Sequence, residues 1–184
     1  FAVLGLLAVS RPARSGAWLA VGALLKVWPA LLLLSVPRRA FPKALAAFVV
    51  TCGAILMTLV LTMDGASSFA SEQRERGLQV ESVPAWLFLV AHLFGWPRRF
   101  VYRYGAMEVS ALGVEAVALA VTVATVVSLA ALVILRFSGR LDDASPADIA
   151  LVVVLVSMVT SRVLSPQYLV WVGGIAAVCL LDRG

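Results

Sequence analysis

Residues 64–109 read DGASSFASEQRERGLQVESVPAWLFLVAHLFGWPRRFVYRYGAMEV, and the rest of the chain is organised around this stretch. It is the only long stretch that is neither an apolar run of membrane-span length nor a short basic turn. Polar and charged residues crowd into positions 74–82, and the 13 residues Val83–Gly95 are then mostly apolar. A helix of that length covers roughly 20 Å, less than the ~30 Å hydrocarbon core of a bilayer. We therefore expect 64–109 to stay on one side of a membrane, with Val83–Gly95 at the membrane surface or tucked among the helices.

The composition predicts an integral membrane protein. Of the 184 residues, 62% are hydrophobic and 14% are charged, and the mean hydropathy is +1.00. Long apolar runs satisfy their backbone hydrogen bonds in lipid only as helices. The fold class expected is all-α, a polytopic transmembrane helix bundle with re-entrant or broken helices and one long outer loop. The four clearest apolar runs are Gly16–Val36, Ala44–Met63, Ser110–Leu135 and Ile149–Leu181.

Charge, histidine and cysteine exclude several classes of protein. The net charge of +5 comes largely from short turns between apolar runs, so it does not indicate a nucleic-acid partner. One histidine and the absence of a CxxC motif leave no recognisable zinc pattern. We expect no cofactor, and the need for a divalent metal stays open. Cys52 and Cys179 lie inside apolar runs and are expected to act as small hydrophobic residues.

The sequence is expected to be an internal piece of a longer protein. It begins with Phe1 rather than Met, and the apolar run Phe1–Val9 resembles the end of a span. Residues 1–184 would then form a single transmembrane domain within that longer chain.

The run Gly16–Val36 is interrupted at Lys26–Pro29. Basic turns flank it on both sides, an arrangement that the positive-inside rule disfavours for a simple crossing. Pro29 lacks an N–H and disfavours helix at Trp28, so a break is expected there. Two alternatives follow: a re-entrant hairpin with both ends in the cytoplasm, which we favour, and a single kinked span.

Counting crossings gives a topology. Residues 44–63 carry the chain across to the outer loop 64–109, and 110–135 return it to a cytoplasmic turn at 136–147. Residues 149–181 are expected to form a helical hairpin with its elbow at 162–168 on the outer side. Ser145 and Pro146 suit the start of the first arm, as cap and first helical residue.

Arg162-x-x-Ser165-Pro166-Gln167-Tyr168 is the sharpest local signal. An arginine between two apolar arms is costly unless it faces a partner, a cavity or the interface. Its guanidinium could grip a phosphate bidentately, with Gln167 and Tyr168 as polar contacts. The alternative is an arginine that snorkels to the lipid headgroups. Lys26 also has two possible roles. It could bind an anionic lipid group, or it could donate hydrogen bonds to the carbonyls freed by Pro29.

The 74–82 segment suits a sugar or phosphate site, where several donors and acceptors must converge. Its candidate binding residues are Arg74, Arg76, Gln79 and Glu81; the alternative is a solvated loop. Ser82 and Pro84 also suit the start of the short helix. Glu108 and Glu115 are expected seven residues apart on one face of the helix that enters the membrane.

Three elements in this order resemble glycosyltransferase family 87, the polyprenyl-phosphate-mannose-dependent mannosyltransferases common in actinobacteria. They are Gly16–Pro29 (GAWLAVGALLKVWP), Arg76–Ser82 (RGLQVES) and Val163–Trp171 (VLSPQYLVW). The resemblance runs from about Gly16 to Leu181. It places the chain in the C-type superfamily of multi-span transferases.

The resemblance implies a multi-pass plasma-membrane enzyme that transfers mannose from a polyprenyl-phospho-sugar to a glycolipid or glycan acceptor on the outer face. It implies inverting transfer without a nucleotide sugar. It also implies a catalytic aspartate in an earlier outer loop, so no catalytic residue is expected within 1–184. Arg162, and with it Arg74, Arg76 and Lys26, would stabilise the leaving phosphate. Glu81 and Gln79 would order the loop or contact sugar hydroxyls.

A transporter or channel subunit is the alternative function, with the broken helices lining a solute path. Such proteins often contain two related halves, but neither broken segment recurs in the sequence. The enzyme is therefore the favoured hypothesis.

Overall fold

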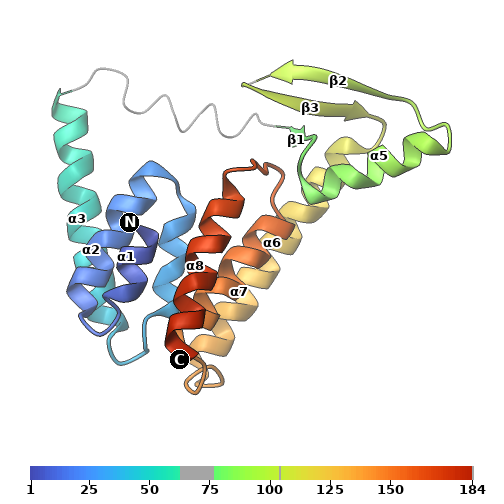
Figure 1. Ribbon diagram of the computed structural model, residues 1–184. Helices are drawn as coiled ribbons and strands as arrows, with labels where there is room; N and C mark the ends of the chain where they lie inside the picture. The colour runs from blue at the N-terminus through green and yellow to red at the C-terminus, as the bar shows by residue number, and fades with distance from the viewer. Residues whose placement is uncertain (63–76, 104, 184) are drawn as a thin grey trace. The chain divides into compact units, whose positions relative to one another are not determined.

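The computed structural model describes residues 1–62, 77–103 and 105–183, without the side chains of residues 182 and 183. Most of these residues are helical, as expected from the composition (Figure 1). The prediction of an all-α fold is wrong in one region, where residues 78–111 contribute a three-stranded antiparallel sheet. The helices are α1 (Ala2–Leu7), α2 (Pro12–Leu25), η1 (Trp28–Ser35), α3 (Phe41–Thr62), η2 (Val83–Ala85), α5 (Trp86–Leu93), α6 (Val114–Phe137), α7 (Pro146–Val159) and α8 (Tyr168–Arg183).

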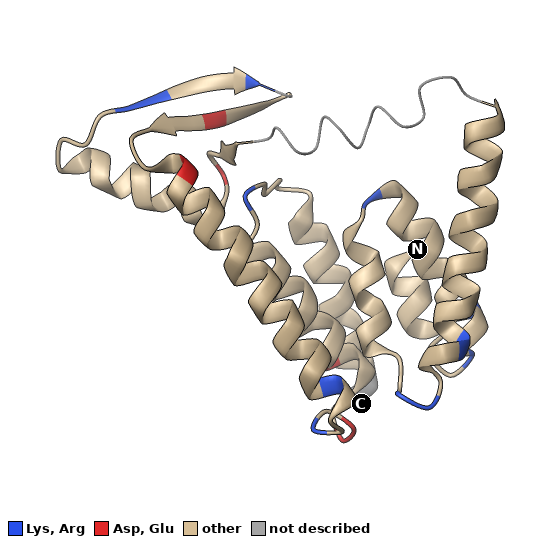
Figure 2. Cartoon of the chain, turned by 180° about the vertical axis from the view of Figure 1, so that it is seen from behind, with Lys and Arg blue, Asp and Glu red and all other residues tan. Residues whose placement is uncertain are grey.

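Within the described residues, α3 and α6 are the helices long and apolar enough to cross a membrane. They have 22 and 24 residues and mean hydropathies of 2.5 and 2.7. At 1.5 Å per residue they extend about 33 and 36 Å, enough for the ~30 Å hydrocarbon core. Figure 2 shows both helices nearly free of charged residues along their length. The apolar helices α7 and α8 are shorter, and a polytopic bundle stays a prediction.

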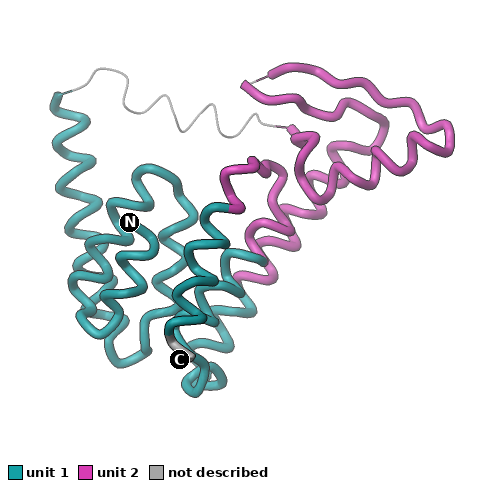
Figure 3. Tube along the Cα trace, viewed as in Figure 1, with its two compact units in different colours: residues 1–66, 130–155, 170–184 teal, residues 67–129, 156–169 magenta. Residues whose placement is uncertain are grey.

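The chain divides into two compact units (Figure 3). Unit 1 comprises residues 1–66, 130–155 and 170–184, and unit 2 comprises 67–129 and 156–169. Three of the four divisions fall inside a helix, so α6, α7 and α8 each contribute residues to both units.

In unit 1 the chain reverses direction between α2 and η1. α2 ends at Leu25, Lys26 is extended (φ −152°, ψ 129°), and the second arm is a tighter 3₁₀ helix that begins beside Pro29. A Cβ built on Gly22 would lie 3.1 Å from the Pro29 Cβ. In one continuous helix these two residues would be about 10 Å apart. The local structure is therefore a hairpin rather than a kinked helix; its re-entry into a membrane stays a prediction.

Small residues allow close helix packing in unit 1. Gly16 of α2 lies directly against the Ala44 carbonyl of α3, where a β-carbon would overlap the oxygen. The Ser15 hydroxyl donates to the Gly5 carbonyl at 2.8 Å and ties α2 to α1. Close contacts of this kind are typical of helices that associate in membranes.

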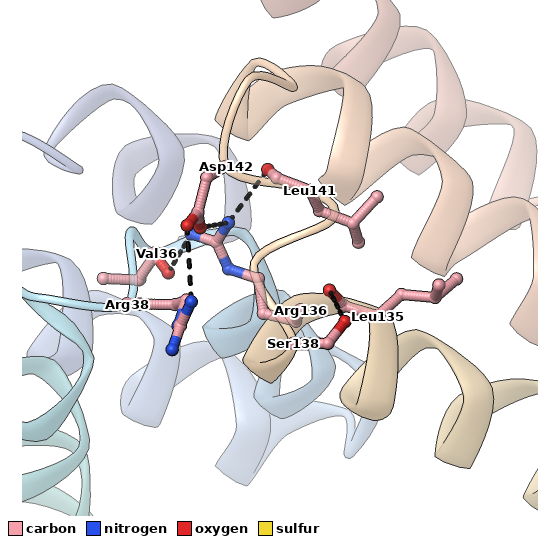
Figure 4. Close-up of polar contacts among 7 residues, drawn as sticks. All are labelled: Val36, Arg38, Leu135, Arg136, Ser138, Leu141 and Asp142. Atoms are coloured by element: carbon pink, nitrogen blue, oxygen red, sulfur yellow. Dashed lines mark hydrogen bonds and ion pairs between the residues drawn. The ribbon is translucent and has the colours of Figure 1, made fainter.

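Arg136, in the last turn of α6, is 3% exposed and fastens two turns of unit 1 together (Figure 4). Its guanidinium donates to the Val36 carbonyl at 2.7 Å and to the Leu141 carbonyl at 3.1 Å. Asp142 lies 3.6 Å from Arg136 and 3.4 Å from Arg38. The sequence predicted Arg136 only as a basic turn residue. The structure shows it as a buried donor that satisfies carbonyls outside any helix.

In unit 2 the strands β1 (Leu78–Gln79), β2 (Arg98–Arg103) and β3 (Ala106–Ala111) pair in the order β1-β3-β2. Val109 at the centre of β3 faces Leu78 on one side and Phe100 on the other. Gly105 (φ +75°), in the connection from β2 to β3, has a backbone conformation that favours glycine. Leu78 of β1 and Val109 of β3 are buried on the side of the sheet against which α6 packs.

The short helix expected over 83–95 is present as η2 followed by α5. Phe88 and Ala85 from these helices join Leu78 and Val109 from the sheet in the buried core of unit 2. Val114 and Val117 of α6 pack against the same core, so helix, sheet and the start of α6 form one packed body. The Ser82 hydroxyl donates to the Gln79 carbonyl at 2.7 Å and makes no cap bond.

Candidate functional site

A polar cavity of about 590 Å³ lies in unit 2, between the sheet, the first turns of α6 and Arg162. Its lining combines guanidinium, carboxylate and hydroxyl groups over an apolar floor. The polar side chains that line it are Arg103, Glu108, Ser110, Glu115, Thr122 and Arg162. Such a mixture of donors and acceptors in one concave site suits a small polar ligand.

The backbone joins Arg162 to the 74–82 segment. The Gln79 N–H donates to the Arg162 carbonyl at 3.0 Å, so β1 lies against the elbow between α7 and α8. The elbow is shaped locally by Ser161, whose hydroxyl donates to the Val163 carbonyl at 2.6 Å and accepts from the Val163 N–H at 3.1 Å. The structure thus brings two segments 83 positions apart in sequence to one cavity.

Glu108 holds the start of the same segment from β3. Its carboxylate is 9% exposed and accepts a hydrogen bond from the Gly77 N–H at 3.0 Å. A Cβ built on Gly77 would lie 2.7 Å from the other carboxylate oxygen. The Val80 N–H donates to the Met107 carbonyl at 2.9 Å and extends the contact. The Arg-Gly-Leu-Gln backbone is therefore fixed against β3 from Gly77 onward.

The expectation that Glu108 and Glu115 share a helix face is wrong. Glu108 lies in β3 and Glu115 in the first turn of α6, with Gly113 (φ +88°) between the two elements. Both carboxylates nevertheless line the cavity, because β3 ends only two residues before α6 begins. A carboxylate in the first helical turn also interacts favourably with the helix dipole.

Three further candidate residues do not line this cavity. Glu81 and Gln167 are exposed and Tyr168 is half-buried at the start of α8; none of the three lines it. Arg74 and Arg76 lie outside the described residues. Of the candidates that the structure describes, Arg162 therefore lines the cavity and Gln79 is hydrogen-bonded to it through the backbone.

Lys26 belongs to unit 1, where it is exposed at the edge of an apolar groove of about 440 Å³. Trp28 and Trp171, whose rings stack with centroids 4.7 Å apart, also line this groove. The groove has few polar groups besides the lysine. Its chemistry suits an apolar chain next to an anionic group.

Sequence reasoning missed Arg103 and the buried role of Glu108. Residues two apart in a strand share a face, so Arg103 lies on the same face of β2 as Val101. Val101 pairs with Glu108 of β3, so the sequences RRFVYR and AMEVSA contained the information that brings Arg103 and Glu108 to one side of the sheet. Gln79 is 7% exposed, and its Oε1 has no hydrogen-bond partner within the part of the chain that the structure describes. No group of three metal-ligating side chains occurs among those residues either.

Comparisons with known proteins give one assignment. Searches of curated proteins and of solved structures found no match to the chain. The family model of glycosyltransferase family 87 matches residues 1–166. The match contains Gly16–Pro29, Arg76–Ser82 and Arg162, and ends before Gln167 and Tyr168. Because it covers most of the 184 residues, the chain belongs to glycosyltransferase family 87.

Proposed function

We propose that this membrane glycosyltransferase transfers mannose from a polyprenyl-phosphate donor to a glycolipid or glycan acceptor on the outer face of a bacterial plasma membrane, as a multi-pass protein. The family assignment supports sugar transfer in a membrane. The observation that carries the donor class is the cavity wall in which Arg162 and the backbone of residues 77–79 meet. No observation favours the transporter, and the family assignment favours the enzyme.

The cavity residues suit the charge changes of such a transfer. The acceptor oxygen forms a bond to the anomeric carbon as the bond from that carbon to the phosphate oxygen breaks. The electron pair leaves with the lipid phosphate, and the acceptor proton passes to a carboxylate base. Arg162 and Arg103 would stabilise the departing phosphate through charge-assisted hydrogen bonds. Glu108 and Glu115 would accept hydrogen bonds from sugar hydroxyls.

The general base is expected to be the aspartate that the family resemblance implies, in an earlier outer loop. Glu108 is less suited to this role because one of its oxygens already accepts the Gly77 N–H. Binding and charge stabilisation, rather than proton transfer, are therefore the roles proposed for Arg103, Glu108, Glu115 and Arg162.

Substitution of Arg162 in the full-length enzyme tests the proposal. Arg162→Ala should lower turnover with polyprenyl-phospho-mannose by about 100-fold while folded protein in the membrane stays near wild type. Arg162→Lys should restore only part of the activity, because an ammonium lacks the bidentate fork. Initial rates in membranes with radiolabelled donor provide the measurement.

Arg99→Ala is the matched control, since Arg99 is an exposed arginine of β2 that does not line the cavity. Wild-type activity of Arg162→Ala would contradict the phosphate-binding role. Donor specificity is tested separately, by comparing initial rates with different donors. Equal rates with polyprenyl-phospho-mannose and with polyprenyl-phospho-glucose or a nucleotide sugar would contradict the assigned donor.

A further inference from the structure

The helix α5 has two apolar faces, and only one of them is buried. Phe88 is 6% exposed and packs into the core of unit 2. At 100° per residue, the exposed large side chains of α5 and its C-cap fall within an arc of about 120° on another side. These side chains, which we name the α5 outer face, are Trp86, Leu87, Val90, Leu93 and Phe94, with exposures of 63%, 62%, 45%, 80% and 86%.

The position of α5 is fixed at the end of a helix that can cross a membrane. Phe88 shares its core with Val109 of β3, and Val114 and Val117 of α6 pack against the same core. Only Leu112 and Gly113 separate β3 from α6. Two residues cover at most about 7 Å, so the sheet and α5 lie close to the level at which α6 enters the bilayer. An apolar face held there meets lipid headgroups and the upper acyl chains.

The residues around this face have the composition of a membrane interface. Residues 83–107 contain three arginines and no aspartate or glutamate. Figure 2 shows the basic positions along β2. Trp96 is 43% exposed at the end of α5, and the Arg98 guanidinium lies 4.2 Å from the Phe100 ring centroid. Tryptophan at the headgroup level and arginine at lipid phosphates are the usual anchors of an interfacial helix.

We propose that the α5 outer face inserts into the bilayer surface that α6 enters, with Arg98 of β2 at the phosphate groups of anionic phospholipids. The helix then lies in the membrane plane with its apolar side chains roughly 5–10 Å deep. This inference does not depend on the sugar that the enzyme transfers.

Spin labels on the full-length protein in vesicles of phosphatidylglycerol and phosphatidylcholine test this arrangement. Single cysteines replace Leu93, Phe94 or Leu87 in a background with Cys52→Ser and Cys179→Ser. Glu81, an exposed residue of the same unit outside α5, is the matched control position. Labels at Leu93 and Phe94 should collide several-fold more often with oxygen than with a water-soluble nickel chelate, and the label at Glu81 should show the reverse.

Two outcomes would overturn the proposal. Equal access of the nickel chelate at Phe94 and Glu81 would place α5 in water. Exclusion of both reagents at Phe94 would show that another protein surface covers the face. Leu87 supplies an independent position if a label at Leu93 or Phe94 reduces the yield of folded protein.

Discussion

Arg136 shows how one buried side chain can hold turns that are far apart in sequence. It donates to the Val36 and Leu141 carbonyls and lies beside Asp142. Arg136→Met should leave these carbonyls without their donor and lower the free energy of unfolding by about 2 kcal/mol. Thermal unfolding of purified protein in detergent, followed by intrinsic fluorescence, is the measurement.

Arg140→Met is the control for that substitution, because Arg140 is an exposed arginine of the same turn. Its midpoint should stay within a degree or so of wild type, since surface substitutions away from such contacts usually change stability by less than about 0.5 kcal/mol. Equal midpoints for Arg136→Met and Arg140→Met would show that the buried guanidinium contributes nothing to stability.

At the scale of elements, Thr125 joins α6 to the end of α7. Its hydroxyl lies 2.8 Å from the Thr160 hydroxyl and 3.0 Å from the Thr160 carbonyl. Thr125→Val keeps the side-chain shape but removes this link, and should destabilise the protein by about 0.6 kcal/mol, the average for such bonds in membranes. Denaturant unfolding in mixed micelles measures the difference.

Thr58→Val in α3 is the matched control. The Thr58 hydroxyl donates within its own helix, to the Ala54 carbonyl at 2.9 Å. It should therefore be close to neutral. If both valine variants unfold at the same denaturant concentration, the bond between α6 and α7 adds no measurable stability.

The sequence predicted helices better than it predicted the sheet. Apolar runs such as Ala44–Met63 predict helix directly, because lipid leaves the backbone no other way to pair. The Ser145 cap was also predicted, and its hydroxyl accepts the Asp148 N–H at 3.1 Å. The sheet was missed because β1 has two residues and pairs with a strand 30 positions away, and because β2 carries arginines on both of its faces.

The site was predictable only where a residue is unusual for its surroundings. Arg162 lies between two apolar segments, where a charged side chain costs free energy unless it faces a partner, a cavity or the interface. The sequence alone therefore identified it as a candidate. Arg103 and Glu108 are ordinary strand residues in sequence, and they reach the cavity only through the pairing of β2 with β3. Their contribution depends on tertiary structure, which local spacing does not encode.

At the scale of the whole molecule, the predicted topology has a direct test. Residues 64–109 and the elbow should share the outer side, and 37–43 and 136–147 should be cytoplasmic. Single cysteines at Met107 and Ser138, both exposed, should therefore react with a membrane-impermeant maleimide from opposite sides. Intact cells and inverted membrane vesicles provide the two orientations. Labelling of both positions from one side would mean that the count of crossings is wrong.

Gly77 has a consequence for how the RGLQ segment tolerates change. The space that a methyl group would occupy at this position is already filled by the Glu108 carboxylate. A methyl group would fit here only if the end of the Glu108 side chain moved, so a neighbouring anion rather than backbone freedom favours glycine. An alanine at position 77 would act at a distance of 31 residues in sequence. It would displace the Glu108 carboxylate, which lines the cavity, and thereby change the charge distribution of the cavity without any change to an arginine.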